Sequence, residues 1–299
     1  MTTETNSWGR WGADDERGAL NKLTEENVMS AVRAIATGRS YQLAIPIQHA
    51  GTPVLDYRGA PHRLTLSSCH DPEMFSGYGA PAGTGANEDI LMIACHNGTH
   101  MDSLSHVFAD DKIYNGFAAE TFKPNSGASR AGIEKCGPVI GRAVFLDIAE
   151  LHGVSSLAAD VVITADDIIA AERRQEVEIR PGDIVLLRTG WMEAYFEATS
   201  RGETLPFEQP GIGKSASKLL VERDVAVVGS DNWAVESIPS DGGFLEAHIE
   251  LQVRHGIPFI EGLTLGELSR DKAGYGFFVA SPLPITGASG SPVNPVFIA

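Results

Sequence analysis

The stretch 96–106, which reads His-Asn-Gly-Thr-His-Met-Asp-Ser-Leu-Ser-His, gathers more metal-binding side chains than any other window of the chain. In an extended segment His100 and Asp102 point to the same face, because side chains alternate along a strand. A turn through residues 103–105 could then bring His106 round to meet them. Gly98 permits the tight backbone entry that other residues rarely adopt. The spacing therefore predicts a short extended segment at which three side chains converge.

These three side chains have the chemistry of a divalent metal site. Imidazole nitrogen combined with carboxylate oxygen suits zinc, manganese or iron better than calcium or magnesium, which prefer shells made of oxygen. We therefore take His100, Asp102 and His106 as candidate ligands of a catalytic ion. Water on such an ion has its pKa lowered from near 16 toward roughly 7, which supplies hydroxide without a Ser or Cys nucleophile. The alternative is a polar loop whose histidines are only hydrogen-bonded, and spacing alone leaves both open.

The order of residues in this window resembles the signature of a known family. The pattern His-x-Gly-Thr-His-x-Asp-x-x-x-His over residues 96–106 is similar to that of the cyclase-like metal-dependent hydrolases, which include bacterial kynurenine formamidase and isatin hydrolase. Farther along, His248 followed by residues 256–258 and Glu261 resembles the downstream His and Glu ligands of that family. The closing segment 287–293 resembles the end of its members.

The resemblance implies more than the residues do by themselves. It implies that His248 and Glu261 join the three motif ligands, either completing one site or binding a second ion, with zinc or manganese as the metal. It also implies a swivelling β/β/α layered fold and a homodimer or homotetramer. The implied reaction is hydrolysis, by metal-activated water, of an amide, lactam, N-formyl or ester bond in a small cyclic or aromatic substrate.

A departing nitrogen needs a proton, and here the sequence differs from the family. Members often have another His a few residues after the motif, but residues 107–111 read Val-Phe-Ala-Asp-Asp. Asp110 or Glu261 could serve as acid or base if its surroundings raised its pKa, and His96 could approach from the other side of the loop. These three residues are the predicted catalytic groups.

Two other classes of function fit parts of the same pattern. Two histidines and one carboxylate also describe the iron site of non-haem oxygenases. A chain that keeps the metal but lacks the proton donor could instead bind a ligand without turning it over. Oxygen consumption with bound iron would indicate the first, and tight binding of a lactam without turnover would indicate the second.

The periodicity of apolar residues predicts an α/β fold in one domain over residues 1–299, with residues 1–22 as an N-terminal arm. A buried strand over residues 90–95 should deliver the metal loop, and residues 49–88 should form loops and short strands that could act as a lid. Further strands are predicted over 41–47, 139–148, 183–189, 225–229, 256–260 and 276–280. Helices are predicted from Thr24 to Gly38, from Thr164 to about residue 175, and over 212–222 and 244–254.

Charge and composition exclude several kinds of partner. With 23 basic and 39 acidic residues the net charge is −16, which would repel nucleic acid and anionic membrane surfaces. No apolar run approaches the roughly 18 residues of a membrane helix, and residues 1–7 do not resemble a secretory signal. Three scattered cysteines argue against a disulfide framework. We therefore expect a cytoplasmic protein that binds a small molecule.

Overall fold

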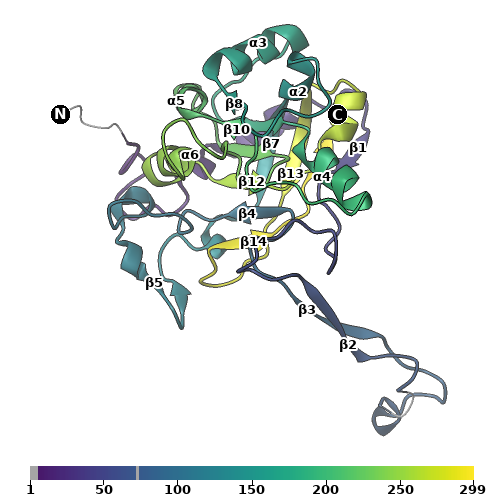
Figure 1. Cartoon of the computed structure of the whole chain (residues 1–299). Helices are drawn as coiled ribbons and strands as arrows, with labels where there is room; N and C mark the ends of the chain where they lie inside the picture. The colour runs from purple at the N-terminus through teal and green to yellow at the C-terminus, as the bar shows by residue number, and fades with distance from the viewer. Residues whose placement is uncertain (1–5, 72–73) are drawn as a thin grey trace.

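A mixed sheet of nine strands runs through the described part of the chain, residues 6–71 and 74–299 of a computed structural model (Figure 1). The strand order is β1-β15-β13-β7-β9-β11-β12-β4-β14. In chain order these strands are β1 (Ser40–Gln42), β4 (His100–Asp102), β7 (Val139–Asp147), β9 (Ile184–Arg188), β11 (Val227–Ser230), β12 (Phe259–Glu261), β13 (Tyr275–Ala280), β14 (Gly290–Pro292) and β15 (Val296–Ile298).

The other elements lie around this sheet. The α-helices are α1 (Glu25–Val32), α2 (Ile148–Leu151), α3 (Ala165–Gln175), α4 (Trp191–Ser200), α5 (Lys214–Glu222), α6 (Glu246–His248) and α7 (Gly266–Arg270). Short 3₁₀ turns are η1 (Gly18–Lys22), η2 (Ser76–Tyr78), η3 (Tyr114–Gly116), η4 (Ala119–Thr121) and η5 (Ile133–Lys135), and η6 (Ile249–Arg254) is a π-helix. The small strands are β2 (His62–Ser67), β3 (Glu88–Met92), β5 (Phe122–Lys123), β6 (Gly127–Ala128), β8 (Val162–Ile163) and β10 (Gly211–Ile212).

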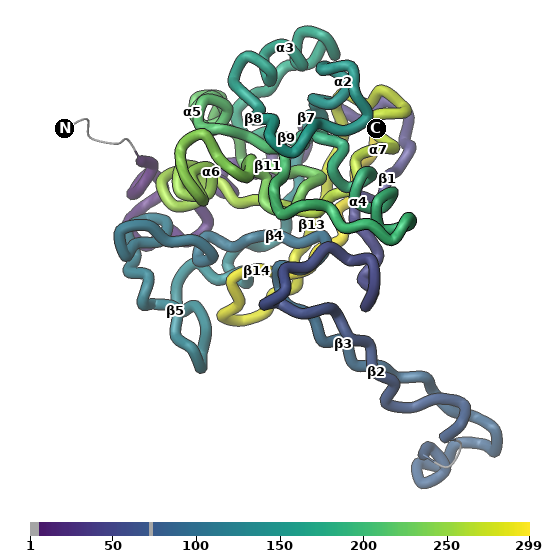
Figure 2. Tube along the Cα trace, viewed as in Figure 1, coloured from purple at the N-terminus to yellow at the C-terminus, as the bar shows by residue number. Residues whose placement is uncertain are grey.

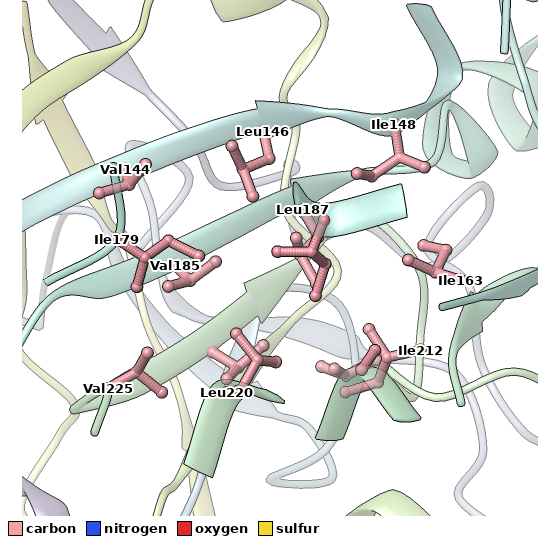
Figure 3. Packing of buried hydrophobic residues seen from close by; sticks show 14 of the residues in the cluster. Val144, Leu146, Ile148, Ile163, Ile179, Val185, Leu187, Ile212, Leu220 and Val225 are labelled. Carbon is pink, nitrogen blue, oxygen red and sulfur yellow. The ribbon is translucent and has the colours of Figure 1, made fainter. Parts of the chain in front are cut away.

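The parallel strands β7, β9 and β11 form the centre of the fold. Every residue of β9 is buried, as expected for a parallel strand with both faces covered. One face packs against α3 and α5, and Figure 3 shows Leu187 of β9 among Ile163, Ile212 and Leu220. The other face packs against the antiparallel part of the sheet, with Leu186 in the same cluster as Phe278 and Met101. The predicted α/β class is confirmed.

Local signals in the sequence placed several helix starts correctly. Thr164 caps α3 with a full capping box, and Thr24 caps α1 by accepting a hydrogen bond from the Asn27 backbone N–H. The predicted extent of α1 was wrong, because the helix ends at Val32 instead of Gly38. Val32 and Ile35 are 44% and 37% exposed, so no packing surface extends the helix.

Strands β2 and β3 form a hairpin that projects away from the body of the protein (Figures 1 and 2), and we call it the arm. The prediction of a buried strand over 90–95 was therefore wrong. Ile90, Leu91 and Met92 lie on the arm and are 42%, 51% and 58% exposed. A short apolar run predicts an extended segment but does not say which surface covers it. Of the predicted lid region, residues 53–58 line a cavity and most of the rest builds the arm.

The described part of the N-terminal segment packs against the chain's own body. The indole N–H of Trp8 donates to the Val253 carbonyl at 2.8 Å, and Arg10 pairs with Asp224 at 2.6 Å. The Ser7 hydroxyl lies 2.9 Å from Nδ1 of His255, which is buried. Residues 1–5 of the predicted N-terminal segment 1–22 lie outside the described residues. Within those that are described, no helix is both long and apolar enough to cross a membrane.

Candidate metal centre

Strand β4 carries the first two predicted ligands and lies between two segments from the far end of the chain. It pairs antiparallel with β12, where His100 lies opposite Glu261, and with β14, where Asp102 lies opposite Gly290. His100 and Asp102 are two residues apart and so share one face of the sheet, as predicted. The sheet register therefore places Glu261 beside the motif, because residues directly opposite each other on paired strands are close neighbours.

The Gly-Thr pair before His100 holds the motif in this position. Gly98 has a positive φ of 66°, a conformation that favours glycine. The Thr99 hydroxyl donates to the Gly262 carbonyl at 2.6 Å and accepts from the Ile45 backbone N–H at 2.9 Å. A Cβ on Gly262 would lie 2.5 Å from the Gly98 carbonyl oxygen. Both glycines are thus required for the motif loop to approach the end of β12.

Two imidazoles and two carboxylates face one another at this point. His100 Nε2 lies 3.2 Å from Glu261 Oε2 and 3.6 Å from Asp102 Oδ1. His248, at the end of α6, brings its Nε2 to 3.5 Å from Glu261 Oε1 and 3.9 Å from Asp102 Oδ2. All four side chains are 5% exposed or less. Four of the five predicted metal ligands therefore meet in one buried cluster.

His106, the fifth, joins the same cluster together with His96. His96 Nδ1 lies 2.8 Å from Asp102 Oδ1, and its ring stacks on that of His106 with centroids 3.9 Å apart. Donor atoms of His96, Asp102 and His106 lie within 4.8 Å of one another, as do those of His100, Asp102 and Glu261. These two groups share Asp102 and could hold one ion or two. His96 was predicted only as a catalytic group, and the structure makes it a candidate ligand as well.

Hydrogen bonds from residues outside the cluster orient its side chains. His100 Nδ1–H donates to the Gly98 carbonyl at 2.9 Å, which turns Nε2 toward the carboxylates. His248 Nδ1 lies 3.0 Å from Glu236 Oε1, and the Gln252 amide donates to Asp102 Oδ2 at 2.9 Å. Sequence reasoning missed both Glu236 and Gln252. Gln252 follows His248 by four residues, a spacing that places two side chains on the same face of a helix and could have indicated Gln252. No comparable sequence pattern indicates Glu236.

The buried donors of the cluster fit a divalent metal. His100 Nε2 and Glu261 Oε1 are both buried and have no partner with hydrogen-bond geometry among the described residues. A buried polar atom without a partner costs free energy, so these two atoms are suited to a cation. The mixture of imidazole and carboxylate donors is that of zinc, manganese or iron sites.

The charged groups of the cluster shift one another's pKa values. Burial acts to lower the pKa of His248, but the Glu236 and Glu261 carboxylates outweigh it and raise this pKa to about 10. Burial also acts to raise the pKa of Asp102, yet the neighbouring imidazoles hold it well below its usual value. For His106 burial dominates and lowers the pKa to about 3. The carboxylates that raise the pKa of His248 supply the negative charge that would also attract a divalent cation.

Asp110, one of the three predicted catalytic groups, is not brought to the cluster. It is exposed, has a positive φ of 49° in a turn closed by the bridge between Ala109 and Lys112, and does not line the cavity. Asp tolerates this left-handed conformation better than most residues, so the turn accounts for its presence. The other two, His96 and Glu261, both line the cavity.

The cluster lies in the wall of a cavity of about 930 Å³. The rest of the wall is largely apolar and includes many aromatic rings. These rings belong to Tyr57, Phe108, Trp191, Tyr195, Phe207, Trp233 and Phe244. A mostly apolar cavity with a few convergent polar groups is the usual form of a site for a small organic molecule.

Sequence comparison agrees with this geometry. The cyclase family model matches residues 41–237, about two thirds of the chain. The chain belongs to the cyclase family. Cyclase-like protein 2 of Arabidopsis thaliana is 27% identical over 219 residues, which are 72% of this cyclase-family chain and 66% of that protein. Kynurenine formamidase of Bacillus cereus is 23% identical over 210 residues, 70% of this chain and 79% of the relative.

Solved structures confirm the fold of this cyclase-family chain. A crystal structure described as a novel cyclase is 31% identical, with a TM-score of 0.89 over 99% of this chain and 98% of the other. An isatin hydrolase bound to the product analogue thioisatinate is 20% identical, with a TM-score of 0.64 over 92% and 99% of the two chains. The layered fold that the resemblance implied is therefore the observed one.

Glu236 in this cyclase-family chain gives a first prediction. Glu236→Gln keeps an oxygen for His248 Nδ1–H but removes the charge that makes the imidazole a better ligand. We expect the dissociation constant of the bound metal to rise roughly 10- to 100-fold, measured by competition with a chelating dye. Glu222→Gln, which changes an exposed glutamate on α5, should leave it unchanged. Equal affinity in the two variants would show that Glu236 does not support the metal.

Proposed function

We propose that this chain is a metal-dependent hydrolase of a small cyclic or aromatic substrate, cleaving the C–N bond of an amide, lactam or N-formyl group, or an ester. The observation that carries the proposal is the cluster of four histidines and two carboxylates in the wall of an aromatic cavity, with His96 and His106 half-buried and the other four side chains buried. The names of the relatives, a kynurenine formamidase and an isatin hydrolase, support hydrolysis of this kind of bond.

Each residue of the cluster has a proposed role in metal binding or in proton transfer. His96, His100, His106, His248, Asp102 and Glu261 would hold one or two zinc or manganese ions, which when bound acidify water and polarise a carbonyl. Burial acts to raise the pKa of Glu261, but His100 and His248 outweigh it and lower this pKa, so the side chain is a carboxylate and not the acid with a raised pKa that the sequence suggested. Of its two oxygens one can face a cation while the other accepts a proton from the attacking water. Glu261 can then return this proton to the departing nitrogen. In this way Glu261 would take the role of the histidine that family members often have after the motif.

A panel of assays tests the proposal. Protein of known metal content would be assayed, with and without oxygen, on N-formyl anilines, isatin-like lactams and lactones. We expect turnover of at least one class in the absence of oxygen, with zinc or manganese bound. Oxygen consumption with bound iron would indicate an oxygenase instead. Tight lactam binding without turnover of any substrate would indicate a binding protein.

We also propose that the chain is a homodimer or homotetramer in the cytoplasm, assembled through the arm. The arm has an apolar face, formed by Leu64, Ile90 and Met92, which no other part of the described chain covers. The opposite face carries the ion pair between Arg63 and Asp89. A hairpin of two strands is only marginally stable alone in water, so a second copy packed on the apolar face would account for it.

The arm gives a second prediction. Ile90→Asp places a charge in the apolar face, and we expect the oligomer to dissociate to monomers in light-scattering measurements. Leu91→Asp is the matched control, because Leu91 is 51% exposed but lies on the opposite face. It should leave the oligomer intact. A wild-type monomer, or dissociation by both variants alike, would contradict assembly through this face.

A further inference from the structure

Arg58 differs in charge from the other residues that line the cavity. It is the one Lys or Arg among the lining residues that the structure describes, and Asp56, Glu236 and Glu261 line the same cavity. The whole chain carries a net charge of −16. Apart from the histidines of the metal cluster, Arg58 is thus the one described lining side chain whose positive charge can attract an anion.

Two hydrogen bonds fix the turn that carries Arg58 to the metal motif. Arg58 Nη1 donates to the His96 carbonyl at 2.6 Å, and the Asn97 side chain donates to the Gly59 carbonyl at 2.8 Å. The turn is closed by the Arg58 backbone N–H, which donates to the Leu55 carbonyl at 2.8 Å. The guanidinium is therefore held beside the first residue of the metal motif.

Most of the hydrogen-bonding capacity of Arg58 is unused. Its Nη1 donates to His96 and its Nε to the Tyr57 hydroxyl at 3.2 Å, whereas Nη2 has no partner among residues 6–71 and 74–299. No Asp or Glu in these ranges forms an ion pair with it. A half-buried guanidinium is normally paired with a carboxylate. Here that carboxylate is missing from the chain itself.

We propose that Arg58 determines specificity by binding a carboxylate on the cyclic or aromatic body of the substrate. The substrates of this chain are then anionic aromatic amides or lactams, a statement that rests on the proposed function. The aromatic wall takes the ring, the metal cluster takes the scissile carbonyl, and the guanidinium takes the acid group. The planar fork of Arg suits a carboxylate better than any other side chain does.

Paired substrates test the proposal on the metal-loaded protein. The ortho, meta and para isomers of formamidobenzoate would be compared with the corresponding formamidobenzamides, which have the same shape without the charge. Wild type should prefer at least one acid to its amide. Arg58→Gln should lower kcat/KM for that acid roughly 10- to 100-fold and for its amide less than about threefold. Arg58→Lys, which keeps the charge, should restore part of the preference.

Arg63→Gln is the matched control, because it removes the same charge from the exposed arm. Arg63→Gln should leave the preference for the acid unchanged. If it lowers kcat/KM for the acid as much as Arg58→Gln does, the effect comes from the net charge of the protein, and the proposal is overturned. An equal fall for acid and amide in Arg58→Gln would also overturn it, since this pattern indicates only that Arg58 supports the His96 carbonyl. Melting temperatures of all variants would verify that they are folded.

Binding without turnover separates this inference from the proposed function. Calorimetry would compare benzoate with benzamide in wild type and in Arg58→Gln. If wild type hydrolyses none of the panel but benzoate binding still depends on Arg58, the hydrolase proposal fails and the inference stands. Benzoate binding of equal strength in the two proteins overturns the inference even if the enzyme hydrolyses amides.

Discussion

Asp102→Asn is expected to remove most of the metal binding and to lower kcat/KM by roughly 10³-fold or more. The Asp102 carboxylate is fully buried and is shared by both groups of candidate ligands. Its Oδ1 lies near His96 and His100, and its Oδ2 accepts from Gln252 and faces His248. No other residue of the cluster touches so many members. Replacing the carboxylate by an amide keeps the volume but removes the negative charge that holds a cation.

Metal content and turnover would be measured on the same preparation of Asp102→Asn. Elemental analysis would give the metal per chain, and the assay would use the best substrate of the wild-type panel. Asp160→Asn makes the same chemical change at an exposed position and should behave like wild type. An Asp102→Asn protein with wild-type metal content and turnover would remove Asp102 from the site.

Gly290→Ala is expected to produce the second largest effect, through the position of His96. A Cβ at Gly290 would lie 2.6 Å from His96 Cε1 and 2.9 Å from the Met101 carbonyl oxygen. The imidazole could move, but the β4 backbone could not move without disturbing its pairing with β12. Overpacking of this kind costs about 1–3 kcal/mol of stability. A displacement of about 1 Å at a reacting group can cost on the order of 10²-fold in rate.

We therefore expect Gly290→Ala to fold with a lower melting temperature and to lose roughly 10²-fold in kcat/KM. Gly77→Ala is the control, because a Cβ there meets nothing within 4 Å and the backbone is not in the left-handed region. Thermal unfolding followed by circular dichroism, with kinetics on the same samples, would check both values. Unchanged kinetics in Gly290→Ala would mean that the closing segment does not position His96.

The positions of His100 and Asp102 could be predicted from the sequence because they depend only on neighbouring residues of one strand. His100 and Asp102 share a face for the simple reason that side chains alternate along a strand. His248 and Glu261 come from segments about 150 residues away, and only the family resemblance pointed to them. Glu236 could not be predicted at all, since its role depends on a side chain that approaches from another element.

The wrong predictions for residues 90–95 and for Asp110 have a common physical cause. Residues 90–95 have the composition of a buried strand, but Ile90, Leu91 and Met92 lie on the projecting arm, where no other described part of the chain covers them. Asp110 follows the motif closely in sequence, yet it is exposed in a left-handed turn and does not line the cavity. Neither burial nor the direction of a turn is encoded in the spacing of residues alone.

The most direct test of the metal centre is anomalous diffraction from crystals grown without chelator, collected at the zinc and manganese absorption edges. The account predicts an anomalous peak enclosed by His100, Asp102 and Glu261, and loss of turnover when a chelator removes the metal. An anomalous map without a peak among these residues, from protein that still turns over substrate in the presence of chelator, would contradict it.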